Sequence, residues 1–92
     1  MSESARRAEL APVVAAAQRV AGIVAARGRG DAAGARQLMG SFDSERELAG
    51  GALLVAELAL GLLQKETGES LDQCVSDLCL HMETALGAPP AR

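Results

Sequence analysis

Residues 48–63 read LAGGALLVAELALGLL, a run of sixteen positions with one charged residue, Glu57, and three glycines. A run of this kind can cross a membrane, fill a protein core or contact another chain. At ~1.5 Å per residue the run spans roughly 24 Å as a helix, which is less than the ~30 Å of bilayer hydrocarbon. Because a charge near the middle also opposes a membrane span, we expect the run to serve a core and a partner.

Capping residues place this run inside a longer helix. Ser44 and Glu47 form the S-x-x-E pattern, in which the hydroxyl and the carboxylate each satisfy a backbone N–H at a helix start. Gly68 is typical of a helix end. The sequence therefore predicts a helix from 44 to about 67.

Two further helices are predicted before this one. Apolar residues at three- and four-residue spacing indicate a helix over about 5–27, in which Pro12 predicts either a kink or a later start near Leu10. Asp31 is the candidate cap of a short helix over 32–39.

A final helix is predicted over 71–86, because Ser70 and Gln73 repeat the capping pattern. No strand pattern competes with these helices. We therefore expect an all-α fold, a small helical bundle of three long helices and one short helix. It forms a single helical domain over 1–92, with loose tails at 1–4 and 88–92.

The same spacing predicts which helix faces form the core. On the first helix these residues are Leu10, Val13, Val14, Ala17, Val20, Ala21 and Val24. On the helix over 44–67 they are Leu48, Gly51, Val55, Leu58, Ala59 and Leu62, and on the last helix Leu71, Val75, Leu78, Met82 and Ala85.

The helix over 44–67 is apolar over much more than half of its circumference, unlike an ordinary surface helix. In a bundle with three long helices, the other two cannot readily cover the whole circumference of this one. Its outer face is therefore a candidate interface with a second chain. Each mid-helix glycine costs roughly 1 kcal/mol relative to alanine, and close packing within the chain or against a partner both explain it. The expected interface residues are Gly50, Leu53, Leu54, Glu57, Leu60, Gly61 and Leu80.

Charge is unevenly distributed along the chain, which has a net charge of −3. Residues 1–42 carry six arginines against three acidic residues, and residues 43–92 carry three basic residues against nine acidic ones. Two halves of opposite charge favour self-association or a charged protein partner, although they can also face one another in a monomer. The acidic balance and a single aromatic residue, Phe42, argue against a nucleic-acid partner.

Cys74, Cys79 and His81 lie within eight residues and raise the hypothesis of a metal site. The two cysteines lie about 140° apart on a helix, and zinc sites use close pairs and four ligands. A metal site built from Cys74 and His81 of two copies is the remaining metal alternative. Cys74 is explained equally well as a small apolar core residue, and His81 as a solvated residue. We therefore expect no metal and no cofactor.

Catalytic chemistry is not expected, because the carboxylates lie mainly at helix starts, where they suit the helix dipole. We predict that the protein is not an enzyme and has no catalytic residues. No secretory signal is evident, which predicts a cytoplasmic protein with reduced cysteines.

Asp43 and Ser44, at the start of a helix in a small acidic helical chain, resemble the phosphopantetheine attachment site of acyl carrier proteins. The resemblance covers only a few residues. Glu45 stands where that family usually has an apolar residue, and the helix to Gly68 is longer than the family's second helix. In composition alone, the alanine-rich helices are similar to small uncharacterised helical proteins of high-GC actinobacteria, which implies no activity.

The sequence thus predicts a non-catalytic module for protein–protein interaction or self-assembly, a homodimer through the helix over 44–67. Its partner is itself or another helical protein, with no nucleic acid and no membrane. The alternative is a carrier or small-ligand-binding bundle that uses Ser44 or an apolar groove beside Met39, Phe42 and Met82.

Overall fold

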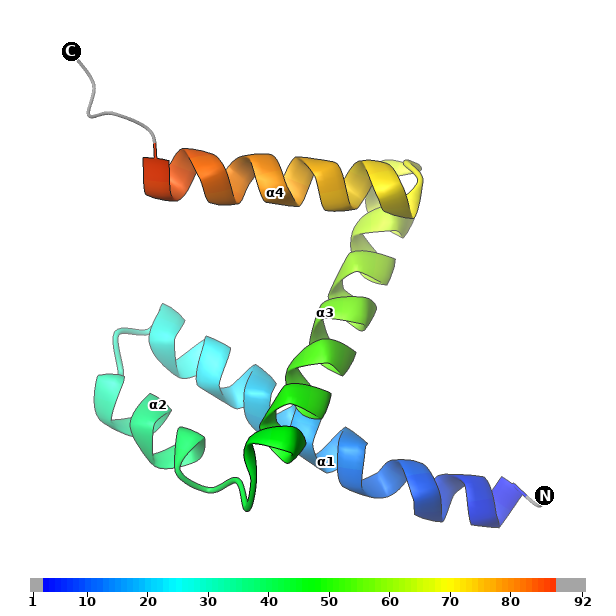
Figure 1. The fold of residues 1–92 in the computed structure, drawn as a ribbon, viewed down its shortest axis with the longest axis vertical. Helices are drawn as coiled ribbons and strands as arrows, with labels where there is room; N and C mark the ends of the chain where they lie inside the picture. The colour runs from blue at the N-terminus through cyan, green and yellow to red at the C-terminus, as the bar shows by residue number, and fades with distance from the viewer. Residues whose placement is uncertain (1–2, 88–92) are drawn as a thin grey trace. The chain divides into compact units, whose positions relative to one another are not determined.

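The computed structural model describes residues 3–87, and every regular element in that range is an α-helix (Figure 1). The helices are α1 (Glu3–Gly28), α2 (Ala32–Met39), α3 (Glu45–Thr67) and α4 (Leu71–Gly87). The prediction of an all-α fold with three long helices and one short helix is confirmed. Contacts divide the chain into two compact units, Met1–Glu57 and Leu58–Arg92, and α3 contributes residues to both.

The start of the chain differs in detail from the prediction. α1 includes Glu3 and runs through Pro12, so a start near Leu10 is wrong. Residues 3–4 form the first turn of α1, while the other predicted tail residues, 1–2 and 88–92, lie outside the described range. The single-domain prediction stays a prediction.

A Schellman turn joins α1 to α2. The N–H of Gly30, at φ +79°, donates to the Arg27 carbonyl at 3.1 Å, and the N–H of Asp31 donates to the Ala26 carbonyl at 2.8 Å. These two bonds end a helix around a left-handed glycine. Asp31 then caps α2 as predicted, accepting from the N–H of Gly34 at 2.8 Å. The short reversal lays α2 beside the C-terminal half of α1 (Figure 1).

The core of the first unit consists mainly of small residues. Ile23, Ala26 and Ala35 form a buried cluster, and Leu38 and Phe42 pack against it. Small side chains let helix backbones approach closely, so this core is thin.

The predicted core face of α1 is therefore partly wrong. Ala17 is buried, but Leu10, Val14 and Val24 are exposed, and the other buried residues of α1 are Ala16, Ile23 and Ala26. Hydropathy ranks leucine and valine above alanine, whereas close helix contacts select the smaller side chains. The buried face is consequently rotated toward Ala16.

The start of α3 carries the predicted cap. The Glu47 N–H donates to Ser44 Oγ at 3.1 Å, and Glu47 Oε1 accepts from the N–H of Asp43 at 3.0 Å. The hydroxyl thus satisfies a backbone donor of the first helical turn, and the carboxylate binds the N–H of the residue before the cap. This confirms the S-x-x-E pattern as a local structural signal.

Arg19 links α1 to the start of α3 and to the connector before it. Its guanidinium lies 3.4 Å from Glu47 Oε2, donates to the Ser41 carbonyl at 3.0 Å, and lies 4.4 Å from the centroid of the Phe42 ring. One side chain thereby joins α1, the connector before α3 and the first turn of α3.

One of the three glycines in residues 48–63, Gly51, is required by close packing within the chain. A Cβ atom added to Gly51 would lie 2.7 Å from the carbonyl carbon of Ala16, and one added to Gly50 would lie 3.8 Å from Val13 Cγ2. A Cβ on Gly61 would meet nothing within 4 Å. Close packing within the chain therefore explains Gly51, whereas Gly50 and Gly61 both have room for a Cβ atom.

The second unit consists of the last turns of α3 and the whole of α4. Gly68, at φ +73°, ends α3, and its N–H donates to the Gln64 carbonyl at 2.8 Å. Ser70 Oγ accepts from the N–H of Gln73 at 3.1 Å and caps α4, as predicted. The connection is therefore fixed by local capping chemistry.

Thr67 organises the same connection. Its hydroxyl donates to the Leu63 carbonyl at 2.9 Å, accepts from the N–H of Glu69 at 3.2 Å, and lies 3.9 Å from Cys74 Sγ. Cys74 has 0% exposure and is the only buried residue within 58–87.

Candidate interaction surface

Nine large apolar side chains are exposed on the second half of α3 and on α4. We call them the 58–86 apolar surface: Leu58, Leu62, Leu63, Leu71, Val75, Leu78, Leu80, Met82 and Leu86. Single exposed apolar side chains are normal, but larger groups mark interaction sites. Since Cys74 is the only buried residue within 58–87, this unit has almost no core of its own.

Four of the exposed apolar residues of α4 form a continuous stripe, while Leu80 lies on the opposite face. Leu71, Val75, Leu78 and Met82 follow one another at four, three and four residues, the spacing of a helix seam. The prediction that this stripe belongs to the core is wrong, because all four side chains are exposed. Burial on α4 is limited to Cys74, at the contact with Thr67.

A second apolar stripe with the same spacing runs along α3. It is buried or half-buried in the first half of the helix and exposed in the second half. Its first part follows the prediction, since Gly51 is buried and Leu48 and Val55 are half-buried. Leu58 and Leu62 continue the stripe but are 62% and 64% exposed, so their assignment to the core is wrong. The second half of α3 therefore presents a helix-packing face that is largely open to solvent.

The predicted interface residues have mixed environments. Leu53 and Leu80 are each 63% exposed, and Glu57 is exposed. Leu54, Leu60 and Gly61 are half-buried, and Gly50 lies beside Val13 of the same chain. Sequence reasoning missed the exposure of Leu58, Leu62 and the α4 stripe. No signal in the sequence distinguished these residues from core residues, because a buried stripe has the same three- and four-residue spacing.

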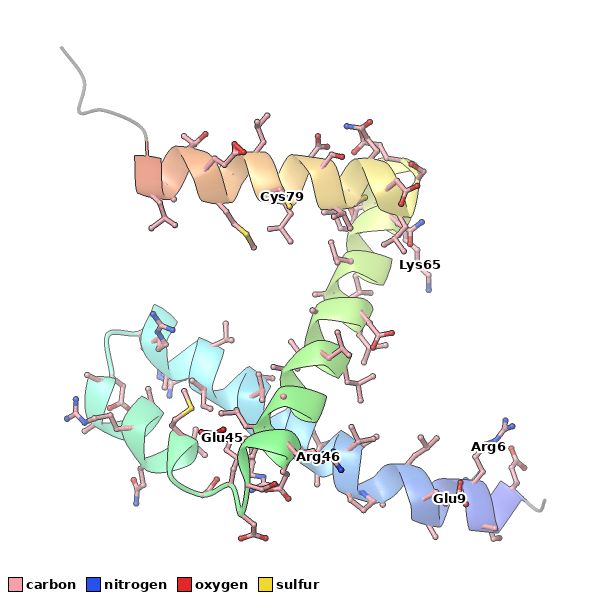
Figure 2. All side chains as sticks on the ribbon, in the orientation of Figure 1. Arg6, Glu9, Glu45, Arg46, Lys65 and Cys79 are labelled. Atoms are coloured by element: carbon pink, nitrogen blue, oxygen red, sulfur yellow. The ribbon has the colours of Figure 1, made fainter. Side chains whose placement is uncertain are left out.

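Two hollows lie in the first unit. One, of about 340 Å³, is lined by Pro12, Val13, Ala16, Ser44, Arg46, Glu47 and Gly50. It is apolar on the α1 side and polar at the first turn of α3, where Figure 2 labels Arg46. Ser44 is the carrier candidate, and its hydroxyl oxygen is engaged as the helix cap.

The other hollow, of about 290 Å³, lies between α1 and α2, and we call it the α1–α2 hollow. Its lining residues are Ile23, Arg27, Ala32, Ala35, Arg36 and Met39. Of the predicted groove residues, Met39 lines this hollow, Phe42 lies under Arg19, and Met82 is exposed on α4.

The three residues that raised the metal hypothesis have different environments. Cys74 is buried, whereas Cys79 is exposed on α4 (Figure 2). His81 is exposed, with Nδ1 3.2 Å from the Asp77 carbonyl oxygen. Within residues 3–87, no three His, Cys, Asp or Glu side chains are grouped to hold a metal ion.

α1 and α3 are each long and apolar enough to cross a membrane, judged by length and composition alone. Core helices of soluble proteins and signal sequences share this property. The observed α3 extends beyond residues 48–63, so the length argument against a span does not apply to the whole helix. The absence of a membrane partner stays a prediction.

Comparisons of the chain with protein-family models, with curated proteins and with solved structures found no match.

Proposed function

We propose that this protein is a non-catalytic self-assembly module that forms a homodimer, in which a second copy covers the 58–86 apolar surface. One observation carries the proposal: nine large apolar side chains are exposed in a unit where Cys74 is the only buried residue within 58–87. Water contact with so many apolar groups is unfavourable, and association removes it.

The free energies of burial and of association require a large part of this surface to be covered in the dimer. Fully burying one leucine-sized side chain contributes roughly 1.5–3 kcal/mol, and each of the nine is already partly covered. Association itself costs about 4–15 kcal/mol. Since a micromolar dimer needs a net gain of about 8 kcal/mol, most of the surface must contribute, and the loss of one central leucine should shift the dimer strongly.

The spacing of the exposed residues supports a second copy as the partner. Alternation of three and four residues lets helices interlock side by side, as in coiled coils. Two-fold dimers, in which both subunits use the same patch, are the commonest homo-oligomers. The stripe on α4 and the Leu58–Leu62 segment of α3 both have this spacing.

The experiment is sedimentation velocity at micromolar concentration on the wild type, Leu62→Glu and Leu10→Glu. Leu10 is an exposed leucine of α1 outside the 58–86 apolar surface, so it provides a matched control. We expect wild type and Leu10→Glu to be dimers and Leu62→Glu to be a folded monomer by circular dichroism. A monomeric wild type, or protein recovered only in membranes after cell fractionation, would contradict the proposal.

A carrier or small-ligand function is the second candidate, favoured by the hollow that Ser44 lines. Its test is the intact mass of protein isolated from its native host. A prosthetic group on Ser44 would favour the carrier, and an unmodified mass would leave the dimer as the better explanation.

A further inference from the structure

The α1–α2 hollow combines an apolar floor with two arginines. Ile23 and Ala35 are buried and form the floor, while Arg27 and Arg36 are exposed lining residues. Within residues 3–87, ion pairs are made by Arg19 and Arg29, and none by Arg27 or Arg36. The hollow therefore suits an apolar group flanked by negative charge.

The outer face of α4 carries a group of this kind. Leu80 is 63% exposed, with Asp77 three residues before it and Glu83 three residues after it. Residues three apart are neighbours on a helix surface, so a carboxylate lies on each side of the leucine. Asp77 accepts a hydrogen bond from Gln73 Nε2 at 2.9 Å, and neither carboxylate forms an ion pair among the described residues.

We propose that Leu80 of one copy docks in the α1–α2 hollow of a second copy, with Asp77 and Glu83 facing Arg27 and Arg36. The inference rests on the proposed homodimer and names the contact that orients its subunits. A cavity of roughly 150 Å³ accommodates a benzene-sized group, so the hollow of about 290 Å³ is large enough for an isobutyl side chain.

Charge complementarity identifies a second copy as the occupant. Residues 58–87 carry one basic residue, Lys65, against five acidic ones, so pairing of the apolar surfaces of two copies leaves this negative charge uncompensated. The arginines of the α1–α2 hollow supply the positive charge. Each copy carries both the hollow and the Leu80 face of α4. Docking is then reciprocal, and its ion pairs fix orientation more than they add affinity.

The test exploits this reciprocity with two charge-reversed proteins, R27E/R36E and D77R/E83R. Each alone should associate at least about tenfold more weakly than the wild type, because both of its contacts place like charges together. An equimolar mixture should form heterodimers, since acidic hollow meets basic helix at one contact and basic hollow meets acidic helix at the other. The charge-matched control R6E/R7E, on the first turns of α1, should dimerise as the wild type does.

The outcomes separate the inference from the proposed function. A dimeric wild type with unchanged R27E/R36E association overturns the docking contact and leaves the dimer standing, whereas a monomeric wild type overturns both. Folded monomeric variants that do not form heterodimers also overturn the contact. If charge reversal prevents folding, R27Q/R36Q replaces it, and its association should lose the salt dependence of the wild type. An unchanged salt dependence overturns the contact.

Discussion

Gly51 of α3 lies directly against the backbone of Ala16 of α1, so closely that an added Cβ would be 2.7 Å from the Ala16 carbonyl carbon and 2.9 Å from its Cβ. At this point the contact between α1 and α3 is made by residues with little or no side chain. Larger apolar residues such as Val24 and Leu53 remain outside.

Gly51→Ala should lower the free energy of unfolding by up to about 2 kcal/mol. Overpacking typically costs 1–3 kcal/mol, and the better helix propensity of alanine offsets about 1 kcal/mol of it. Gly61→Ala is the control in the same helix, where open space allows a gain of up to ~1 kcal/mol. Urea unfolding at one fixed protein concentration measures both, and equal changes would refute the packing role of Gly51.

Arg19→Ala should destabilise the protein by about 1–2 kcal/mol, because Glu47, the Ser41 carbonyl and the Phe42 ring all lose a partner. A double-mutant cycle with Phe42→Leu should give a coupling of about 0.5–1 kcal/mol for the cation–π contact. Arg29→Ala is the control, because its pair with Asp31 is long, at 4.0 Å, and exposed, and should contribute less than ~0.5 kcal/mol. A cycle without coupling would refute the stacking.

Ser44→Ala should cost about 1 kcal/mol, because the N–H of Glu47 loses its acceptor. Ser44→Asp keeps an acceptor at the helix start and should stay within ~0.5 kcal/mol of the wild type. Thermal unfolding of the two variants measures the difference. If Ser44→Asp were as unstable as Ser44→Ala, the serine would have a role other than capping.

The two thiols should react at very different rates. Cys79 is exposed and Cys74 is fully buried, so an alkylating reagent should modify one thiol rapidly in native monomer and the second only after unfolding. Cys79→Ser should abolish the rapid phase. Mass spectrometry of time points measures both phases, and two thiols reacting together would contradict the burial of Cys74.

Helix ends were predictable from sequence because they depend on short-range chemistry. Asp31, Ser44, Ser70 and Gly68 each satisfy backbone groups within four residues, and each was identified from local pattern alone. Tertiary context changes such bonds little.

Helix faces were less predictable, because periodicity identifies an apolar stripe but not how many neighbours cover it. Leu58 and Leu62 have the same spacing as Gly51 and Val55, yet only the earlier pair is covered. The burial of Ala16 in place of Val14 follows from backbone proximity, which hydropathy does not measure. Leu53 and Leu80 are exposed, and their placement at an interface stays a prediction.

The alanine-rich core also has a calorimetric consequence. Small side chains bury little apolar area, so unfolding of the isolated chain should have a low heat-capacity change. In the proposed homodimer, exposed side chains such as Leu58 and Leu62 would also leave water, and their burial would add to the heat-capacity change of assembly. The melting temperature should therefore rise with protein concentration.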